Sequence, residues 1–328
     1  MTEAGAVIRF PMEQYTVMGL TEVLTKIPAH WRLLSGLGKE LKAGRYDLVI
    51  LVDYPEFNLR LALAAHAAKI PTLYFIAPQL WAWRPGRAAT IRAAVSRLAV
   101  ILPFEEEYFA RLGIAATFVG HPLAEMSWPS RVVSRTALGL RERDRVLVLF
   151  PGSRVQETNR LWPVFRAVGL HLLAEGACDT VLVAATPGSD YPDSGAIIVH
   201  RGESAHLLAA ADAALVKSGT TTLESACTGT PMVVAYRVHP LTAWIARRML
   251  SLDRISLVNL IGNAEIVPEF LQQAVGCEAL VAAVRPLLDP TGPESRKQRE
   301  ALDLVRTRLG LPGAAQRVVA LAEELLAA

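Results

Sequence analysis

A single arginine stands where an apolar run ends and a helical pattern begins, in the stretch "LFPGSRVQETNR" at residues 149–160. A guanidinium at the positive end of a helix dipole normally costs about a few tenths of a kcal/mol. That cost is understandable if an anion docks there, so Gly152, Ser153 and Arg154 predict an anion site. The alternative is that Arg154 is a solvated surface residue.

A second turn of this kind occurs in "VKSGTTTLESACTGTP" at residues 216–231. Here an apolar run meets Ser218, Gly219 and Thr220, whose N–H groups and hydroxyls suit a phosphate at a helix N-terminus. Glu224 follows about one helical turn later, where its carboxylate could accept both hydroxyls of a ribose. Together they predict a nucleotide-diphosphate site, and the alternative is an ordinary helix cap with one exposed glutamate.

An acidic residue follows an earlier strand pattern in "LVDYPEFNLRLA" at residues 51–62. At the mouth of a cleft, Asp53 could remove a proton from an acceptor hydroxyl, a role worth about 10²–10⁴ in rate. Pro55 is a good first helical residue, so Asp53 could equally cap the helix that starts there. The residues alone leave both readings open.

Aromatic and histidine side chains complete the polar loops. Trp81 and Trp83 in "APQLWAWRPGR" (77–87) suit sugar stacking or a lipid contact, although burial under the sheet explains them too. His121 in "VGHPL" (119–123) could donate to a phosphate or an acceptor, or simply satisfy a turn. Residues 17–34 form an apolar stripe with interspersed bases that fits either a bilayer interface or a core.

The elements that must position these residues follow a βαβ rhythm. Strands are predicted at 46–52, 72–77, 97–103, 117–120, 145–151, 180–186, 196–200, 213–217 and 231–236. Helices are predicted at 57–69, 87–95, 105–112, 157–175, 203–210, 221–228, 240–250 and 264–274, with a linker at 124–144. The pattern predicts two doubly wound parallel sheets in series, whose polar residues gather beyond the carboxyl ends of the strands.

Composition limits the class of protein. The chain has 328 residues, 52% of them apolar and 20% charged, which indicates a globular protein with two domains. No apolar run reaches the roughly 18 residues of a spanning helix, and no secretion signal is visible at the start. Three cysteines without metal-type spacing indicate reduced thiols in a cytosolic protein. The modest formal charge of +3, without basic clusters among aromatics, argues against nucleic-acid binding.

A series of motifs across roughly residues 12–275 resembles the lipid-A-disaccharide synthase family in order and spacing. The motifs are "VDYPEFN", "PQLWAWRPGR", "LPFEEEYF", "FVGHPLAE", "FPGSR", "KSGTTTLE", "TPMVVAYRVHPLTAWIARR" and "SLVNLIGNAEIVPE". The resemblance implies the GT-B fold, in which two Rossmann-like domains face each other across a cleft. It also implies an inverting transfer of 2,3-diacylglucosamine from its UDP conjugate to 2,3-diacylglucosamine 1-phosphate, which gives a β-1,6 disaccharide and UDP.

The resemblance assigns roles to positions of this chain. Asp53 would be the general base, and UDP-sugar contacts would come from Gly152, Ser153, Arg154, Ser218, Gly219, Thr220, Glu224, Tyr236, Arg237, Asn259 and Glu265. Trp81, Trp83, Arg84 and His121 would line the acceptor side, and Val23, Leu24, Ile27 and Trp31 would touch the membrane. No metal and no cofactor are expected. The two acylated sugars and the inner membrane surface are the expected partners, in a cytoplasmic, peripheral location; a homodimer is compatible with the sequence.

Three departures from the family pattern qualify these expectations. About 45 residues with the family's first strand and a "GEASGD"-like loop are missing before Met1, so the first domain is expected to be incomplete, and a miscalled start is the favoured explanation. Ala264 stands where the family has arginine, and Glu56 replaces an aspartate. The expected domains are 1–140 for the acceptor, 141–293 for the UDP-sugar and 294–328 for crossing helices. A UDP-N-acetylglucosamine 2-epimerase-like isomerase and a non-catalytic UDP-sugar-binding remnant are the alternatives.

Overall fold

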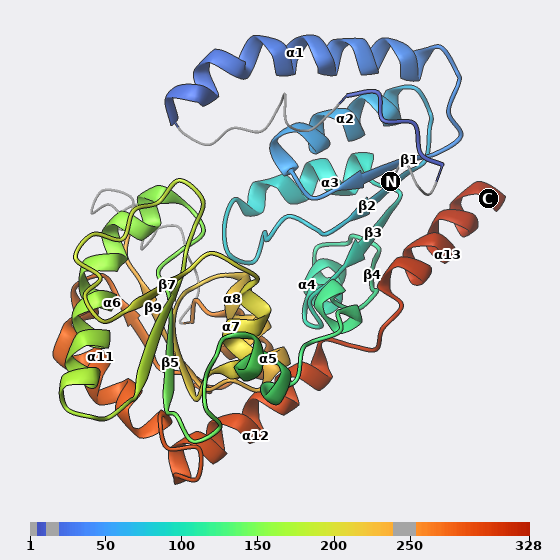
Figure 1. Cartoon of the computed structure of the whole chain (residues 1–328). Helices are drawn as coiled ribbons and strands as arrows, with labels where there is room; N and C mark the ends of the chain where they lie inside the picture. The colour runs from blue at the N-terminus through green and yellow to red at the C-terminus, as the bar shows by residue number, and fades with distance from the viewer. Residues whose placement is uncertain (1–4, 11–19, 239–253) are drawn as a thin grey trace.

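The chain folds into two lobes, each built on a parallel sheet (Figure 1). The computed structural model describes residues 5–10, 20–238 and 254–328. The first sheet has the order β1-β2-β3-β4, and the second has the order β10-β9-β8-β5-β6-β7. The strands of the first are β1 (Val49–Val52), β2 (Thr72–Phe75), β3 (Arg97–Val100) and β4 (Ala116–Phe118). Those of the second are β5 (Val146–Phe150), β6 (Thr180–Ala184), β7 (Ile198–His200), β8 (Ala213–Lys217), β9 (Met232–Tyr236) and β10 (Glu269–Leu271).

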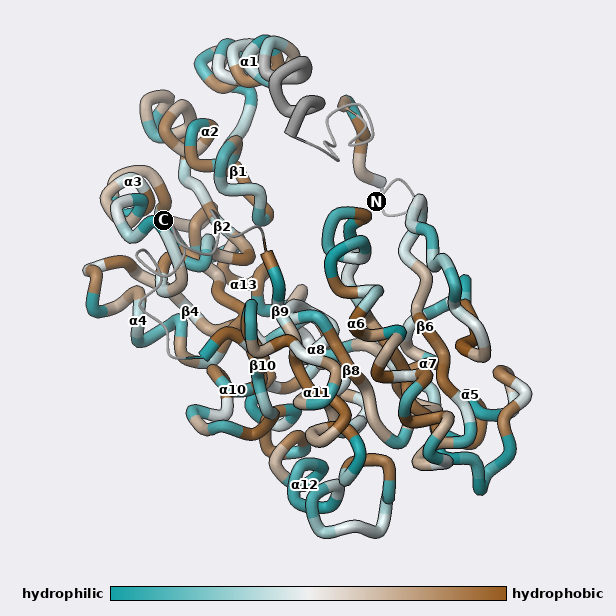
Figure 2. Tube along the Cα trace, turned by 90° about the vertical axis from the view of Figure 1, so that its left-hand side faces the viewer, coloured by the Kyte–Doolittle hydropathy of each residue, from teal (hydrophilic) through white to brown (hydrophobic). Residues whose placement is uncertain are grey.

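The second sheet is a three-layer sandwich. Its central strands read as continuous apolar runs because helices cover both faces, and all five residues of β5 are buried. In Figure 2 the buried strand β8 is mostly hydrophobic, whereas the outer helix α12 is mostly hydrophilic. One face packs on α6 (Val155–Ala174) and α11 (Cys277–Val284). The other packs on α7 (Ser204–Ala210), α8 (Thr220–Thr228), α10 (Leu257–Gly262) and α12 (Pro293–Arg308).

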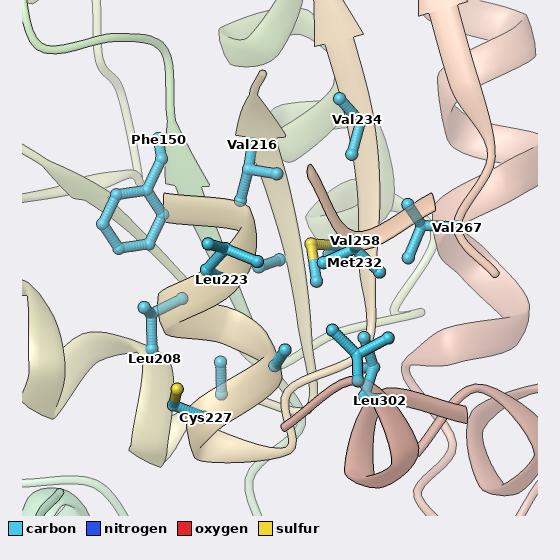
Figure 3. Packing of buried hydrophobic residues seen from close by; sticks show 14 of the residues in the cluster. Phe150, Leu208, Val216, Leu223, Cys227, Met232, Val234, Val258, Val267 and Leu302 are labelled. Carbon is cyan, nitrogen blue, oxygen red and sulfur yellow. The ribbon is translucent and has the colours of Figure 1, made fainter. Parts of the chain in front are cut away.

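The core between this second face and its helices is dense (Figure 3). Phe150, Val216 and Val234, from three strands, belong to one buried cluster with Leu223 on α8 and Leu302 on α12. Burying a side chain of this size contributes about 1.5–3 kcal/mol. Packing in this core therefore fixes the position of α8, whose N-terminus lies beyond the strand ends.

The first lobe is smaller. Its sheet packs on α2 (Pro55–Ala67), α3 (Ala88–Ala94) and α4 (Glu105–Arg111), and α1 (Leu20–Lys42) lies over α2 (Figure 1). Short 3₁₀ turns, Pro85–Arg87 and Pro122–Glu125, lie in the loops after β2 and β4. The helix α5 (Arg131–Ala137) falls within the range expected for the first domain, yet it packs against α7 of the second lobe.

The C-terminal segment crosses between the lobes. It leaves the second sheet through the 3₁₀ turns Gln272–Ala274 and Arg285–Leu287 and through α12, then ends in α13 (Ala314–Ala327). Figure 1 shows α12 under the second lobe and α13 beside the first. There Val318, Leu321 and Ala322 cover the free face of β2 and β3.

The structure confirms the βαβ rhythm and the position of Arg154 between β5 and α6. The predicted helix at 264–274 is wrong, because this range holds the strand β10 and a 3₁₀ turn, while α10 precedes it and α11 follows it. The predicted linker contains α5, capped by the Ser130 hydroxyl, which accepts from the N–H of Val133. The predicted helix at 240–250 lies outside the described residues.

Candidate functional site

Two cavities adjoin at the N-terminus of α8. The first, which we call the β5–β8 cavity, has a volume of about 510 Å³ and is lined by the loops that follow β5, β6 and β8. The second, the inter-lobe cavity, has about 380 Å³ and is lined by loops of the first lobe together with Thr220 and Leu257 of the second. Thr220 borders both cavities. The carboxyl ends of two parallel sheets therefore open onto neighbouring spaces.

The β5–β8 cavity contains most of the predicted phosphate loop. Gly152, Ser153 and Arg154 enter it from the end of β5, and Gly219 and Thr220 enter it from the end of β8. The Arg154 side chain is 78% exposed. The backbone N–H groups at the start of α8 and the long, exposed guanidinium side chain of Arg154 line the same cavity, and together they suit a multiply charged anion.

Lys217, for which no role was predicted, also lines this cavity. The Lys217 ammonium lies 3.1 Å from Glu157 Oε1, and the Arg154 guanidinium lies 3.3 Å from the same oxygen. Glu157 Oε2 accepts from the N–H of Ser153 at 3.1 Å. Burial acts to raise the pKa of Glu157, but the charge and hydrogen bond of Lys217 and the N–H of Ser153 hold that pKa below its ordinary value.

Glu224 lines the same cavity from the second turn of α8. Its carboxylate has no hydrogen-bond partner among the described residues, and burial raises its pKa. A half-buried acceptor without a partner is expensive unless a ligand or water serves it. The geometry therefore supports a ligand hydroxyl opposite Glu224.

Other predicted donor-side residues are held by the fold. The Ser218 hydroxyl donates to the carbonyl of Ile255 at 3.2 Å. Asn259 is 1% exposed; its amide donates to Val267 and Glu269 and accepts from the N–H groups of Ile266 and Val267. Both residues thus fix loops next to the cavity and have little left to offer a ligand.

Three further predictions have different outcomes. Arg237 donates to the carbonyl of Val275 at 2.6 Å, and the ring of Tyr236 lies 5.7 Å from the ammonium of Lys217. The structure does not bring Glu265 to this place: it lines a separate cavity with Lys297 and other residues of α12. Tyr236 alone of the three is in contact with a cavity cation.

Asp53 lines the inter-lobe cavity on a strained turn. Asp53 and Tyr54 have φ values of 46° and 47°, in the left-handed region that residues with a side chain seldom adopt. Two donors hold the Asp53 carbonyl: the Tyr74 hydroxyl at 2.7 Å and the Asn58 amide at 2.7 Å. The Asp53 carboxylate is exposed and has no hydrogen-bond partner among the described residues.

Strain is concentrated around this cavity. Ile76, directly after β2, has φ 63°, and Arg84 in the tryptophan loop has φ 55°. For a β-branched residue such as isoleucine this conformation is a real outlier. Strained residues that persist around one cavity point to a functional site, because the surrounding structure must be organised to hold them.

His121 faces the inter-lobe cavity as a neutral donor. Its Nδ1 accepts from the N–H of Leu123 at 3.1 Å, so the hydrogen lies on Nε2. Burial lowers the pKa of His121 to about 4. The histidine satisfies a turn and also presents an N–H to the cavity, so the two readings of the sequence are compatible.

The two tryptophans of this loop have different environments. Trp83 is 42% exposed, lines the inter-lobe cavity, and has the Arg84 guanidinium 4.2 Å above its ring. Trp81 packs edge-on against Phe104 and donates its indole N–H to Glu105 Oε1 at 3.0 Å. Burial is therefore the role of Trp81, while exposure to the cavity is that of Trp83.

Glu105 and Arg87 also line the inter-lobe cavity, and no role was predicted for either residue. Glu105 is 1% exposed, and its Oε2 accepts from the N–H of Leu102 at 3.1 Å. Burial raises the pKa of Glu105 to about 7. Arg87 lies 2.5 Å from Glu56 Oε1. The run Glu105–Glu107 resembles an ordinary acidic first turn, so the sequence carries no signal that its first member is buried.

On the far side of the first lobe, α1 presents an exposed face that includes Trp31, Arg32, Lys39 and Lys42. Trp31 is 55% exposed, with the Arg60 guanidinium 4.8 Å from its ring. Val23, Leu24 and Ile27 fall outside the side chains that the structure describes. Among the described residues no helix has the length and apolar character to cross a membrane, and none of their acidic, histidine and cysteine side chains form a group that could hold a metal ion.

Comparisons with solved structures identify the architecture. The chain matches UGT89C1 of Arabidopsis thaliana with a TM-score of 0.63 at 15% identity, covering 98% of this chain and 84% of the other. It matches UDP-GlcNAc 2-epimerase of Neisseria meningitidis with a TM-score of 0.63 at 13% identity, covering 93% and 82%. At these identities the likeness concerns the fold alone, and that fold is GT-B.

Sequence comparisons identify the family. The family model described as lipid-A-disaccharide synthetase matches residues 1–312. A lipid-A-disaccharide synthase of Syntrophus aciditrophicus is 40% identical, over 94% of this chain and 84% of the relative, and one of Myxococcus xanthus is 38% identical, over 98% and 86%. The chain therefore belongs to the lipid-A-disaccharide synthetase family, whose members are hexosyltransferases of lipid A biosynthesis.

Proposed function

We propose that this chain transfers 2,3-diacylglucosamine from its UDP conjugate to 2,3-diacylglucosamine 1-phosphate, with inversion, and releases UDP. The observation that carries the proposal is the junction at Thr220. There, a cavity with cations and the Glu224 carboxylate meets a cavity with the Asp53 carboxylate, and neither carboxylate has a hydrogen-bond partner among the described residues. A donor bound in one can present its sugar to an acceptor in the other.

The β5–β8 cavity has the groups that a UDP-sugar needs. Arg154 and Lys217 supply positive charge to the diphosphate, and the N–H groups at the start of α8 supply hydrogen bonds. Glu224 accepts from the ribose hydroxyls. Ser218 and Asn259 act one step further out, because their own hydrogen bonds hold the surrounding loops.

The inter-lobe cavity has the groups that the acceptor needs. Asp53 accepts the proton of the acceptor 6-hydroxyl, and the neutral His121 donates its Nε2–H to an acceptor oxygen. Trp83 offers a ring face for sugar stacking, and Arg87 offers charge for the 1-phosphate. Trp81 and Glu105 hold this wall in place.

The chemical step follows from these positions. As Asp53 takes the proton, the acceptor oxygen attacks the anomeric carbon of the donor, and the bond from that carbon to the diphosphate oxygen breaks on the opposite face. One displacement of this kind inverts the configuration. The leaving UDP gains negative charge, so Arg154, Lys217 and the α8 dipole stabilise the transition state more than the ground state.

We also propose that α1 meets the membrane surface. Both substrates are acylated, and each buried methylene is worth about 0.8 kcal/mol, so their chains stay in the bilayer. The exposed Trp31 and the bases Arg32, Lys39 and Lys42 form a face suited to anionic head groups. Pelleting with phosphatidylglycerol vesicles tests this: a Leu24→Gln, Ile27→Gln, Trp31→Gln variant should pellet less than the unaltered chain.

The control for the vesicle assay changes Val132 and Val133 to glutamine, since both are exposed apolar residues on α5. This control should pellet as the unaltered chain does. Equal pelleting of all three proteins would reject the membrane face on α1.

The reaction itself is tested with the purified chain, UDP-diacylglucosamine and the acylated 1-phosphate acceptor. UDP release that depends on the acceptor, with a disaccharide whose new linkage is β by NMR, supports the proposal. An α linkage would reject inversion and the single displacement. Epimerisation of UDP-N-acetylglucosamine without acceptor would favour an isomerase, and UDP binding without turnover would favour a non-catalytic binding protein.

A further inference from the structure

The two cations that line the β5–β8 cavity are already paired with a carboxylate from the first turn of α6. The Glu157 carboxylate is bound by the ammonium of Lys217, the guanidinium of Arg154 and the N–H of Ser153, at 3.1, 3.3 and 3.1 Å. Those three donors all belong to residues that line the cavity. The positive charge that would meet a diphosphate is therefore neutralised from within.

The local backbone is built to admit this carboxylate. Gly152 has φ 145°, and a Cβ at this position would lie 2.5 Å from Glu157 Cβ. Only glycine lets the loop after β5 pass so close to the first turn of α6. Glu157 in turn folds back over the loop, with its side chain 16% exposed.

A helix cap explains only part of this arrangement. An acid in the first turn that accepts from a backbone N–H just before the helix is a capping interaction. Here the second oxygen holds two cations from two different strand ends, β5 and β8, and neither cation is needed for the cap. The Glu157 carboxylate therefore neutralises two cations of the cavity in addition to capping α6.

Charge balance shows the consequence. The positive charges of Arg154 and Lys217 are balanced by Glu157, which pairs with both, and by Glu224, which lines the cavity with them. This balance suits an empty site but not one that holds a diphosphate. A diphosphate and Glu157 would compete for the same two cations, and like charges at this distance repel. One of the two must give way.

We infer that Glu157 is an internal competitor for the diphosphate: it holds Lys217 and Arg154 when the site is empty, yields them to the nucleotide donor, and takes them back to release UDP. This inference rests on the proposed function. It makes Lys217 a diphosphate-binding residue and Glu157 a positioning residue that sets the lifetime of the product complex.

The test measures UDP binding by calorimetry and UDP dissociation by stopped flow. Replacing Glu157 with glutamine keeps the shape and an acceptor for the Ser153 N–H but removes the competing charge. Glu157→Gln should bind UDP about tenfold more tightly than the unaltered chain, mainly through slower dissociation. Lys217→Met should bind about tenfold more weakly, because a cation of the site is lost.

The matched control is Glu175→Gln at the other end of α6, where the carboxylate pairs with Arg285 outside both cavities. It should bind UDP as the unaltered chain does. Glu157→Ala, which removes the cap as well, serves as a second variant, and circular dichroism verifies that each protein is folded. Both Glu157 variants should show the slower dissociation.

The outcomes separate the two proposals. If the unaltered chain binds UDP and Glu157→Gln binds it equally or more weakly, Glu157 is only a cap and the inference is overturned while the proposed function stands. If the unaltered chain binds no UDP, the proposed function and the inference both fall. Tighter binding by Glu157→Gln, absent in Glu175→Gln, supports the internal competitor.

Discussion

The two cavities treat their charged residues differently. In the β5–β8 cavity Arg154 and Lys217 both pair with the Glu157 carboxylate, so an anionic ligand must compete with Glu157 for them. In the inter-lobe cavity the Asp53 side chain has no hydrogen-bond partner among the described residues, while its backbone is held tightly. A general base needs a carboxylate oxygen that is available to take the proton, and it needs a rigid backbone that keeps this oxygen in position.

The first prediction concerns Asp53. Asp53→Asn keeps the shape of the side chain but cannot take a proton, so turnover should fall by about 10²–10⁴. UDP affinity should not change, because the nucleotide contacts lie in the other cavity. Steady-state rates and calorimetry measure the two quantities. Asp303→Asn, on the exposed side of α12, is the control, and wild-type turnover by Asp53→Asn would disprove the role of base.

The second prediction concerns pH and Glu105. Burial raises the pKa of Glu105 to about 7, above its value in the unfolded chain. The folded protein therefore binds the proton more tightly, and the stabilisation is complete below the unfolded pKa and lost as pH rises through about 7. From pH 5 to 8 the free energy of unfolding of the unaltered chain should fall by roughly 3 kcal/mol relative to Glu105→Gln.

Urea titrations at several pH values give this difference. His121 has the opposite sign, since its pKa is lowered to about 4 and its contribution is lost as pH falls toward that value. The two effects oppose each other at mildly acid pH, so only the comparison between variants isolates Glu105. Glu106→Gln, exposed on the next position of α4, should leave the pH profile unchanged. A parallel profile for Glu105→Gln would show that the carboxyl does not titrate in this range.

At the scale of elements, the third prediction concerns the turn between β1 and α2. Asn58 reaches back from α2 to the carbonyls of Val52 and Asp53, at 3.0 and 2.7 Å. Asn58→Ala should therefore cost about 1–3 kcal/mol of stability and release the strained turn. We expect turnover to fall with little change in UDP affinity. Gln316→Ala, an exposed amide on α13, should change neither, and unchanged turnover in Asn58→Ala would show that the turn holds without it.

The elements that the sequence predicted well are those buried on both faces. The runs at 145–151 and 213–217 became β5 and β8, because a strand between two layers of helices is apolar throughout. The short edge strand β10 has mixed polarity, so its residues fitted a helical pattern and the prediction at 264–274 was wrong. Its place is set by pairing with β9, which no local pattern reveals.

The site was predictable to a similar degree. Asp53 and Arg154 were predicted from their positions directly after strands, and both line cavities at that edge of the sheets, which parallel sheets present to ligands. Lys217 and Glu157 lie 60 positions apart and meet only through the pairing of β5 with β8. The burial of Glu105 was not predicted, because buried carboxyl groups are rare and the following residues Glu106 and Glu107 are exposed.

At the scale of the molecule, the C-terminal segment ties the two lobes together. After α12 it passes to the first lobe, where the N–H of His121 donates to the carbonyl of Leu309 at 2.8 Å. Arg317 on α13 donates to the carbonyl of Val119 at 2.8 Å. The loop that presents His121 to the inter-lobe cavity is therefore held by residues nearly two hundred positions away, and the packing of α13 bears on the geometry between the lobes.

Glu125 is the residue on which the last prediction rests, because its carboxylate accepts from the N–H groups of Gly313, Ala314 and Ala315 at the start of α13. A capping carboxylate of this kind is worth about 0.5–2 kcal/mol. In Glu125→Ala, hydrogen exchange should therefore become faster in α13 and in the first sheet beneath it, while β5 keeps its protection. Glu324→Ala, exposed near the end of the same helix, should leave exchange unchanged. Faster exchange throughout both lobes would show that α13 does not open by itself, and that the molecule unfolds as one unit.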